Sequence, residues 1–141
     1  MPVRSSEAVW EGTLREGSGT VKTGSGVIEA PYTFMSRFED GSESNPEEML
    51  GSAHAACLAM QVAADLQRAG YDPEKVTATA NVHLEKVDGT QSITKIVVDV
   101  EGSAPDVDEA EFLEIATGAK ENCIISRALG AIDIEMNAVL V

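Results

Sequence analysis

Hydrophobic and polar residues alternate with a period of two over much of the second half of the chain. Val76, Ala78, Ala80, Val82 and Leu84 fall on one side of such a stretch, with polar residues between them. This pattern is typical of a strand with one buried face. The turn-forming pair Asp88-Gly89 follows, and residues 93–100 complete a predicted hairpin. A similar alternation over residues 132–140 predicts a last strand.

A helical period replaces this alternation after Asn45. Asn45 is a good N-cap, Pro46 suits the first turn, and Glu47 and Glu48 match the positive end of the helix dipole. Apolar or small residues then recur at helical spacing: Met49, Leu50, Ala53, Ala56, Cys57, Met60, Ala63, Ala64 and Leu66. The prediction is a helix over residues 45–70 that ends at Gly70. Its small-residue centre, 51–59, suggests that other elements approach closely and bury it on several sides.

The remaining segments complete an α+β order. Residues 108–122 predict a second helix and 124–129 a short third one. Upstream of the long helix, β-rich segments punctuated by Gly and Pro predict a strand meander, at residues 8–10, 19–23, 26–29 and 32–34. We therefore expect an α+β fold with largely antiparallel sheets. We expect one domain over residues 1–141, with a strand meander at 1–44, the long helix at 45–70 and a hairpin, helix and strand half at 71–141.

Composition excludes several classes of protein. The 141 residues hold 24 acidic and 10 basic side chains, for a formal charge of −14. This balance disfavours binding to nucleic acids and to anionic membranes, because both need clustered Lys and Arg. No apolar run approaches the length of a membrane span. The first thirty residues hold four glutamates and no long apolar run, so we expect no signal peptide and a cytoplasmic location.

The two cysteines, Cys57 and Cys123, are too few for a disulfide-stapled scaffold. A buried, inert thiol is one interpretation of each. The other is a redox pair, in which one thiol reacts and the second resolves. Cys57 lies about three turns into the predicted helix, beyond the reach of the dipole. A reactive Cys57 would therefore need another positive charge.

Arg37 is the candidate for that charge. It lies between Phe34 and Phe38, and a partly buried guanidinium needs an anionic partner. Glu47 precedes Cys57 by close to three helical turns, so the two would share a helix face. A bidentate Arg37–Glu47 pair would then be fixed near the sulfur. The alternatives are a solvated surface Arg37 and a Glu47 that only complements the helix dipole.

A zinc site is a competing hypothesis. His54 and Cys57 are three residues apart on the predicted helix, and with His83 and Cys123 they would supply four ligands. However, the sequence contains no CxxC or HxxxH pattern, and His83 falls on the polar side of its strand. Phosphate-binding glycine loops and the GxSxG motif of serine hydrolases are also missing.

Longer stretches of the chain resemble a known family. The resemblance rests on the run from Asn45 to Cys57, with Trp10-Glu11-Gly12 and Arg37-Phe38 upstream. It continues through residues 84–87, residues 93–96 and Cys123 in Cys-Ile-Ile-Ser. Together these residues resemble the OsmC branch of the OsmC/Ohr hydroperoxide reductases.

The resemblance implies an OsmC-like intertwined α+β homodimer with long central helices and sites at the subunit interface. It implies a thiol-dependent peroxidase, without metal or organic cofactor, that reduces organic hydroperoxides to alcohols. In that scheme Cys57 is the peroxidatic cysteine and Cys123 the resolving one. Arg37 stabilises the thiolate and Glu47 orients Arg37. An external dithiol, from small thiols or a lipoylated protein, would be the reductant.

Two positions depart from the family pattern: Ile124 stands where relatives often carry Pro, and Leu58 where Phe is common. The first affects the rigidity of the chain at Cys123 and the second the shape of the pocket. A non-enzymatic alternative also stays open. In it the chain is a stress-related dimer that binds a hydrophobic ligand, with Cys57 as an inert wall residue.

Overall fold

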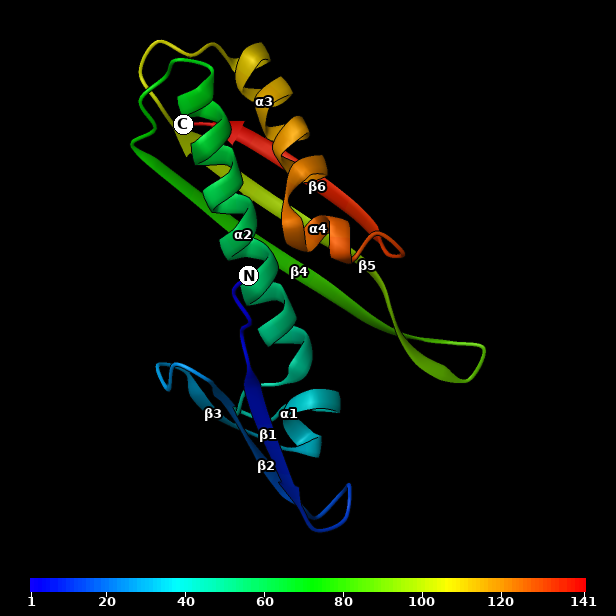
Figure 1. Ribbon diagram of the computed structural model, residues 1–141. Helices are drawn as coiled ribbons and strands as arrows, with labels where there is room; N and C mark the ends of the chain where they lie inside the picture. Colours follow the sequence, from blue (N-terminus) through cyan, green and yellow to red (C-terminus); the bar gives the residue numbers. More distant parts are fainter. The chain divides into compact units, whose positions relative to one another are not determined.

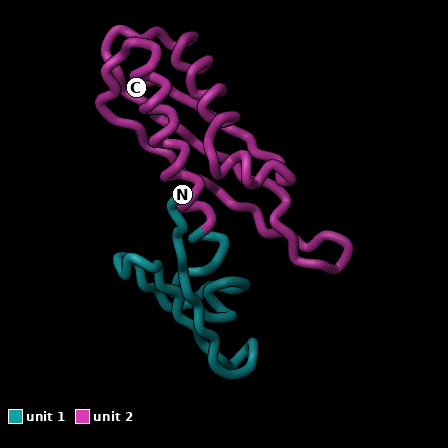
Figure 2. The backbone as a smooth tube through the Cα atoms, viewed as in Figure 1, with its two compact units in different colours: residues 1–49 teal, residues 50–141 magenta.

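The computed structural model describes all residues from Met1 to Val141. They form two compact units, Met1–Met49 and Leu50–Val141, coloured separately in Figure 2. Helix α2 (Pro46–Arg68) begins in the first unit and continues through the second. Its bounds confirm the predicted long helix to within two residues at the C-terminal end. The expectation of one domain over residues 1–141 stays a prediction.

The first unit is a three-stranded antiparallel sheet followed by a short helix. The strands β1 (Ser6–Glu11), β2 (Ser18–Thr23) and β3 (Glu29–Tyr32) are paired in chain order, and helix α1 (Phe34–Phe38) follows. Trp10 and Tyr32 both lie opposite Gly19 in the register. Because Gly19 has no side chain, the two rings meet across it with centroids 5.3 Å apart.

Two of the strands predicted in this region are wrong in extent. Residues 26–28 form the β2–β3 turn, because Gly26 takes a positive φ of 74° and the Thr23 hydroxyl accepts the Ile28 N–H. Residues 33–34 lie at the start of α1, where the Thr33 hydroxyl accepts the Ser36 N–H at 3.1 Å and the Ser36 hydroxyl accepts the Thr33 N–H at 2.9 Å. This capping box turns the chain from strand to helix.

The second unit is a sheet covered by helices on one face. Its strands are β4 (Lys75–Val87), β5 (Thr90–Ser103) and β6 (Asp133–Leu140), in the order β4-β5-β6. β4 and β5 form the expected antiparallel hairpin, whereas β6 pairs parallel to β5. The connection between β5 and β6 contains helix α3 (Glu109–Asn122) and helix α4 (Ile124–Ala128). Figure 1 shows α2 and α3 against the same face of this sheet. The fold is thus the predicted α+β class, with one parallel pairing.

The hydrophobic core lies between this sheet and the two helices. The inward positions of the alternating strands stand in rows across the sheet, such as Val82–Ile96–Ile134. The helices supply the opposite wall with the fully buried side chains Leu58, Val62, Leu66, Phe112, Ala116 and Ala119. Burial of this apolar surface is the main stabilising contribution of the second unit.

Helix α2 is buried on one side only. At Gly51 an added Cβ would lie 3.2 Å from the Ala80 carbonyl oxygen, so a small residue is needed against β4. On the other side Ala53, Ala56 and Met60 are exposed. The expectation that α2 is buried on several sides is therefore wrong within this chain. None of the helices combines the length and apolar character needed to cross a membrane.

Candidate functional site

Cys57 lies in the middle of α2, next to the core residue Leu58. The helix turns Leu58 fully inward, whereas Cys57 stays half-buried at the border of the core. The Cys57 residue thus packs against the core and keeps part of its surface exposed.

Cys123 lies at the break between α3 and α4. It ends α3, where its N–H donates to the Ala119 carbonyl at 2.8 Å, and it precedes α4, where its carbonyl accepts the Arg127 N–H at 3.0 Å. Its extended ψ of 127° separates the two helices and turns the side chain into the core. Cys123 is completely buried. The predicted end of α3 at Asn122 is confirmed.

The two sulfur atoms meet although 66 residues separate them in the sequence. The Sγ atoms of Cys57 and Cys123 are 2.9 Å apart, and both residues are free thiols. The contact is a hydrogen bond between the two thiols. Little movement is needed to bring the sulfur atoms to the roughly 2.05 Å of a disulfide bond.

The surroundings shift the pKa values of the two thiols in opposite directions. Burial raises the pKa of Cys57, and the hydrogen bond to Cys123 raises it further, against smaller contributions from the backbone N–H groups of Ile125 and Ile124. Burial by itself also raises the pKa of Cys123. Hydrogen bonds with Cys57, with Ser126 and with the Ile125 backbone outweigh it, so that the net pKa is lowered. The surroundings therefore favour the neutral form of Cys57, and a nearby positive charge would favour its thiolate.

A buried histidine and serine stand beside the thiols. His54 lies one turn before Cys57 on α2, and its Nε2 atom is 2.8 Å from the Ser126 hydroxyl oxygen on α4. His54 has no exposed surface, and burial lowers its pKa. Its Nδ1 atom has no hydrogen-bond partner.

In the first unit, Arg37 and Glu47 form the predicted bidentate pair. Arg37 Nη2 and Nε donate to Glu47 Oε1 at 2.8 and 3.2 Å, and Nε also approaches Oε2 at 3.3 Å. The Glu47 side chain is 10% exposed and that of Arg37 41%. A carboxylate so buried needs such a partner, and the fork geometry fixes the plane of the guanidinium.

Asn45 links the residues that carry this ion pair. Its side-chain amide donates to the Ser36 carbonyl on α1 at 3.1 Å. Its side-chain oxygen accepts the Glu48 N–H at 2.8 Å and so caps α2. One residue thereby positions the end of α1, which carries Arg37, against the start of α2, which carries Glu47.

Arg37 also borders an aromatic hollow of about 370 Å³. The walls include the rings of Trp10, Tyr32, Phe34 and Phe38, together with Leu14. The Phe38 ring lies 5.3 Å from the guanidinium carbon, in cation–π range. An apolar hollow with one fixed cation suits a ligand that has an apolar body and a polar or anionic end.

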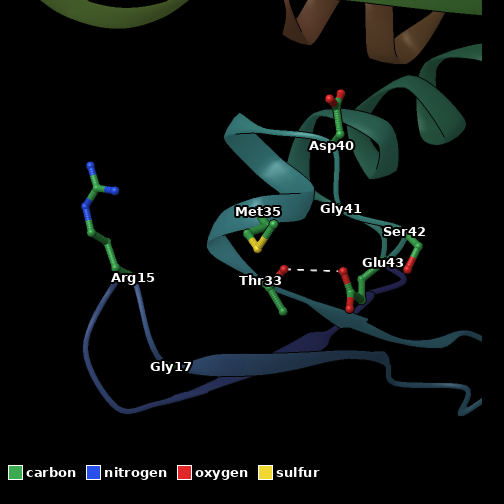
Figure 3. A pocket seen from close by; sticks show the side chains of 8 residues that line it. All are labelled: Arg15, Gly17, Thr33, Met35, Asp40, Gly41, Ser42 and Glu43. Atoms are coloured by element: carbon green, nitrogen blue, oxygen red, sulfur yellow. Dashed lines mark hydrogen bonds between the residues drawn. The ribbon is translucent and has the colours of Figure 1, made fainter.

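A second hollow of about 440 Å³ has a polar wall (Figure 3). It is lined by Arg15 and by residues of the loop after α1, and the Thr33 hydroxyl donates to Glu43 across it at 3.3 Å. It contains none of the predicted site residues.

The structure thus brings the predicted residues together as two pairs. Arg37 contacts Glu47 in the first unit, and Cys57 contacts Cys123 in the second. Sequence reasoning missed Ser126 and the aromatic walls at Trp10 and Tyr32. Ser126 closes the Cys-Ile-Ile-Ser segment, one helical turn after Cys123, and that spacing is the signal that could have identified it.

The residues of the zinc hypothesis do not assemble. No three His, Cys, Asp or Glu side chains gather in a way that could hold a metal ion. His54 is instead engaged with Ser126. The proposed set of His54, Cys57, His83 and Cys123 is therefore wrong as a ligand group.

Comparisons with known proteins identify relatives of this chain in sequence and in fold. The OsmC-like protein family model matches residues 39–137. Peroxiredoxin OsmC of Escherichia coli is 43% identical over 129 residues, which cover 91% of this chain and 90% of that protein. An OsmC-like protein from Mycoplasma pneumoniae superposes with a TM-score of 0.77 at 18% identity, covering 99% of this chain and 98% of the other. An organic hydroperoxide resistance protein from Legionella pneumophila superposes with a TM-score of 0.73 at 21% identity, covering 100% of both chains. The matched region holds Glu47, Cys57 and Cys123, and the chain belongs to the OsmC-like protein family.

Proposed function

We propose that this chain is a thiol-dependent peroxidase that reduces organic hydroperoxides to alcohols. The observation that carries the proposal is the contact between two free thiols, Cys57 and Cys123, with their sulfur atoms 2.9 Å apart. Its relative in Escherichia coli is named a peroxiredoxin, and a structural neighbour is named an organic hydroperoxide resistance protein. Both names describe the chemistry that such a thiol pair can perform.

Accessibility assigns the first step to Cys57. The Cys57 thiolate attacks the distal oxygen of the hydroperoxide, the O–O bond breaks, and the electron pair leaves on the alkoxide. The alkoxide takes up a proton and departs as the alcohol, and Cys57 becomes a sulfenic acid. Cys57 is half-buried whereas Cys123 has no exposed surface, so a peroxide reaches Cys57 first.

Cys123 acts in the second step. Its sulfur attacks the Cys57 sulfur, the S–O bond breaks, and the oxygen leaves as water with the thiol proton of Cys123. The product is the Cys57–Cys123 disulfide, which an external dithiol reduces by exchange. Supply of such dithiols is characteristic of the cytoplasm, which is the location that we propose.

Arg37 is the proposed electrostatic catalyst. The raised pKa of Cys57 means that its ionisation depends on a cation. The Arg37 guanidinium, held by the buried Glu47, offers a fixed positive charge with one side exposed. It would stabilise the thiolate and the alkoxide that forms from the peroxide. The aromatic hollow beside Arg37 would hold the organic group of the substrate.

A homodimer is the proposed assembly. The exposed side of α2 carries Ala53, Ala56 and Met60, small or apolar residues that a second copy of this chain would cover. Ala56→Arg should shift the protein to monomers in light scattering, while Gln67→Arg at the exposed end of the same helix should not. A wild-type chain that is monomeric at all concentrations would contradict this assembly.

Single-turnover oxidation with cumene hydroperoxide tests the proposed activity. The wild-type chain should lose two thiols per peroxide and form an internal disulfide. Cys123→Ser should stop at a sulfenic acid on Cys57 that dimedone traps, and Cys57→Ser should consume no peroxide above background. If Cys57→Ser consumed the peroxide as fast as the wild type, the assignment would fail. An inert Cys57 together with binding of apolar ligands would favour the non-enzymatic alternative.

A further inference from the structure

Two side-chain contacts of the second unit lie one helical turn apart. His54 Nε2 lies 2.8 Å from Ser126 Oγ, and the Sγ atoms of Cys57 and Cys123 lie 2.9 Å apart. His54 precedes Cys57 by three residues on α2, and Ser126, in α4, follows Cys123 by three residues. His54 and Cys123 have no exposed surface and Ser126 has 6%.

The direction of these hydrogen bonds follows from His54. Its Nδ1 atom is buried and has no partner. A proton on Nδ1 would leave an orphaned buried N–H, a rare and costly arrangement. With the proton on Nε2 instead, His54 donates to the Ser126 oxygen. The single hydroxyl hydrogen of Ser126 is then free to point at the Cys123 sulfur.

We propose that His54 and Ser126 are positioning residues for Cys123, which they hold as the attacking sulfur when the disulfide forms and as the leaving sulfur when it is reduced. This inference rests on the proposed peroxidase function. A neutral imidazole orients the serine hydroxyl, and the hydroxyl donates to the developing negative charge on Cys123. Neither His54 nor Ser126 loses its proton at any stage.

In disulfide formation the Cys123 sulfur attacks the Cys57 sulfenic acid. The new S–S bond uses the electron pair of Cys123, the S–O bond breaks, and the departing oxygen takes the former Cys123 proton and leaves as water. The Ser126 hydrogen bond stabilises the anionic sulfur during this attack. The lowered pKa of Cys123 supports this polarity, in addition to the geometry.

In reduction the same arrangement directs the incoming thiol. A thiolate of the external dithiol attacks Cys57, the more exposed sulfur, and the S–S bond electrons leave on Cys123. A sulfur that is already stabilised as an anion leaves faster in thiol–disulfide exchange. The first mixed disulfide should therefore form on Cys57, with Cys123 released as the thiolate.

A pair of matched variants tests the role of His54. His54→Gln keeps an N–H donor at a similar distance from the backbone, whereas His54→Leu fills similar space without one. After single-turnover oxidation with one equivalent of cumene hydroperoxide, rapid quenching gives separate rates for Cys57 oxidation and for disulfide formation.

We expect His54→Leu and Ser126→Ala to slow disulfide formation roughly tenfold to a hundredfold, the range for a lost hydrogen bond to a charged group. They should also increase the sulfenic acid trapped by dimedone. Cys57 oxidation should stay within about twofold, and His54→Gln should recover most of the rate of disulfide formation.

The outcomes separate this inference from the function on which it rests. Normal Cys57 oxidation with disulfide formation at the wild-type rate in Ser126→Ala would overturn the role of the pair and leave the peroxidase intact. Failure of the wild-type chain to oxidise Cys57 would overturn the function itself. A measurement on the wild-type chain does not depend on folding of the variants. When a labelled monothiol opens the disulfide, the label should be found on Cys57, and label mainly on Cys123 would contradict the proposal.

Discussion

Glu47 is the buried member of its ion pair with Arg37. The difference in exposure between the two side chains indicates that Glu47 holds Arg37 in place and that Arg37 can contact a ligand. The Glu47 carboxylate is 10% exposed and accepts from two guanidinium nitrogens, while Arg37 keeps 41% of its surface open. The carboxylate therefore fixes the guanidinium, and the open side of the guanidinium remains available to an anion.

Replacing Arg37 by lysine should separate charge from geometry. Lysine keeps the positive charge but cannot form the fork, so we expect kcat/KM for cumene hydroperoxide to fall about tenfold or more, and about a hundredfold for Arg37→Ala. Arg68→Lys is the matched control, because Arg68 is exposed and its ion pair with Asp65 involves no residue of the proposed machinery. Equal losses in Arg37→Lys and Arg68→Lys would contradict a specific role for Arg37.

His54 should make the stability of the protein depend on pH. Burial lowers its pKa from 6.5 in the folded chain, so below about pH 6.5 the unfolded chain binds the proton and the folded chain resists it. The contribution of the neutral ring is complete above that pH and is lost as the pH falls, with a slope of at most about 1.4 kcal/mol per pH unit. Urea unfolding of wild type and His54→Gln between about pH 7.5 and 5 should show the steeper loss in wild type. A constant difference between the two proteins would contradict this prediction.

The sequence predicted two of the three residue pairs of the site and missed the third. Arg37 was paired with Glu47 because a partly buried guanidinium needs an anionic partner, and helical spacing placed Glu47 near the face of Cys57. The bidentate pair is present. Cys57 and Cys123 were proposed as a redox couple, and the structure places them in contact. The contact between His54 and Ser126 joins residues 72 apart on two helices, and no local pattern encodes it.

Among the elements, β5 and α3 meet at a glycine. An added Cβ at Gly102 would lie 2.4 and 2.6 Å from two ring atoms of Phe112, which is itself fully buried. The strand can thus lie close under the helix only because position 102 carries no side chain. Gly118, in the interior of α3, has open space around the same position.

Two glycine-to-alanine changes therefore have opposite expected signs. Gly102→Ala should destabilise the protein by about 1–3 kcal/mol, because Phe112 has no space into which to move. Gly118→Ala should stabilise it by about 0.5–1 kcal/mol, because alanine is the better helix former. The free energy of unfolding from urea titration measures both. A Gly102→Ala protein as stable as wild type would show that the strand and helix can separate without cost.

Elements with long periodic patterns were predicted correctly, as was the short helix α4, whereas α1 and the direction of β6 were not. Helix α2 and the β4–β5 hairpin follow from periods of 3.6 and 2. The five residues of α1 are too few to show a helical period, and its first residue, Phe34, was assigned to the preceding strand. The direction of β6 could not be read either, because parallel and antiparallel strands alternate in the same way.

On the scale of the whole molecule, the two compact units raise the question of cooperativity. Trp10 is the only tryptophan and belongs to the first unit, whereas most of the helical structure belongs to the second. If residues 1–141 behave as one domain, urea unfolding followed by Trp10 fluorescence and by far-ultraviolet circular dichroism should give coincident curves. We expect coincidence, because α2 is shared by both units. Two separate midpoints would show that the units unfold independently.

Parallel pairing of β5 and β6 also determines when the two thiols first meet during synthesis of the chain. Parallel strands need a long crossover, and Cys123 lies inside this one, between α3 and α4. Cys57 therefore leaves the ribosome long before its partner can be placed beside it, and the crossover must close before the sulfur atoms approach. A bond between them is therefore disfavoured on a partly made chain, and a peroxide can close the internal disulfide only after the crossover is complete.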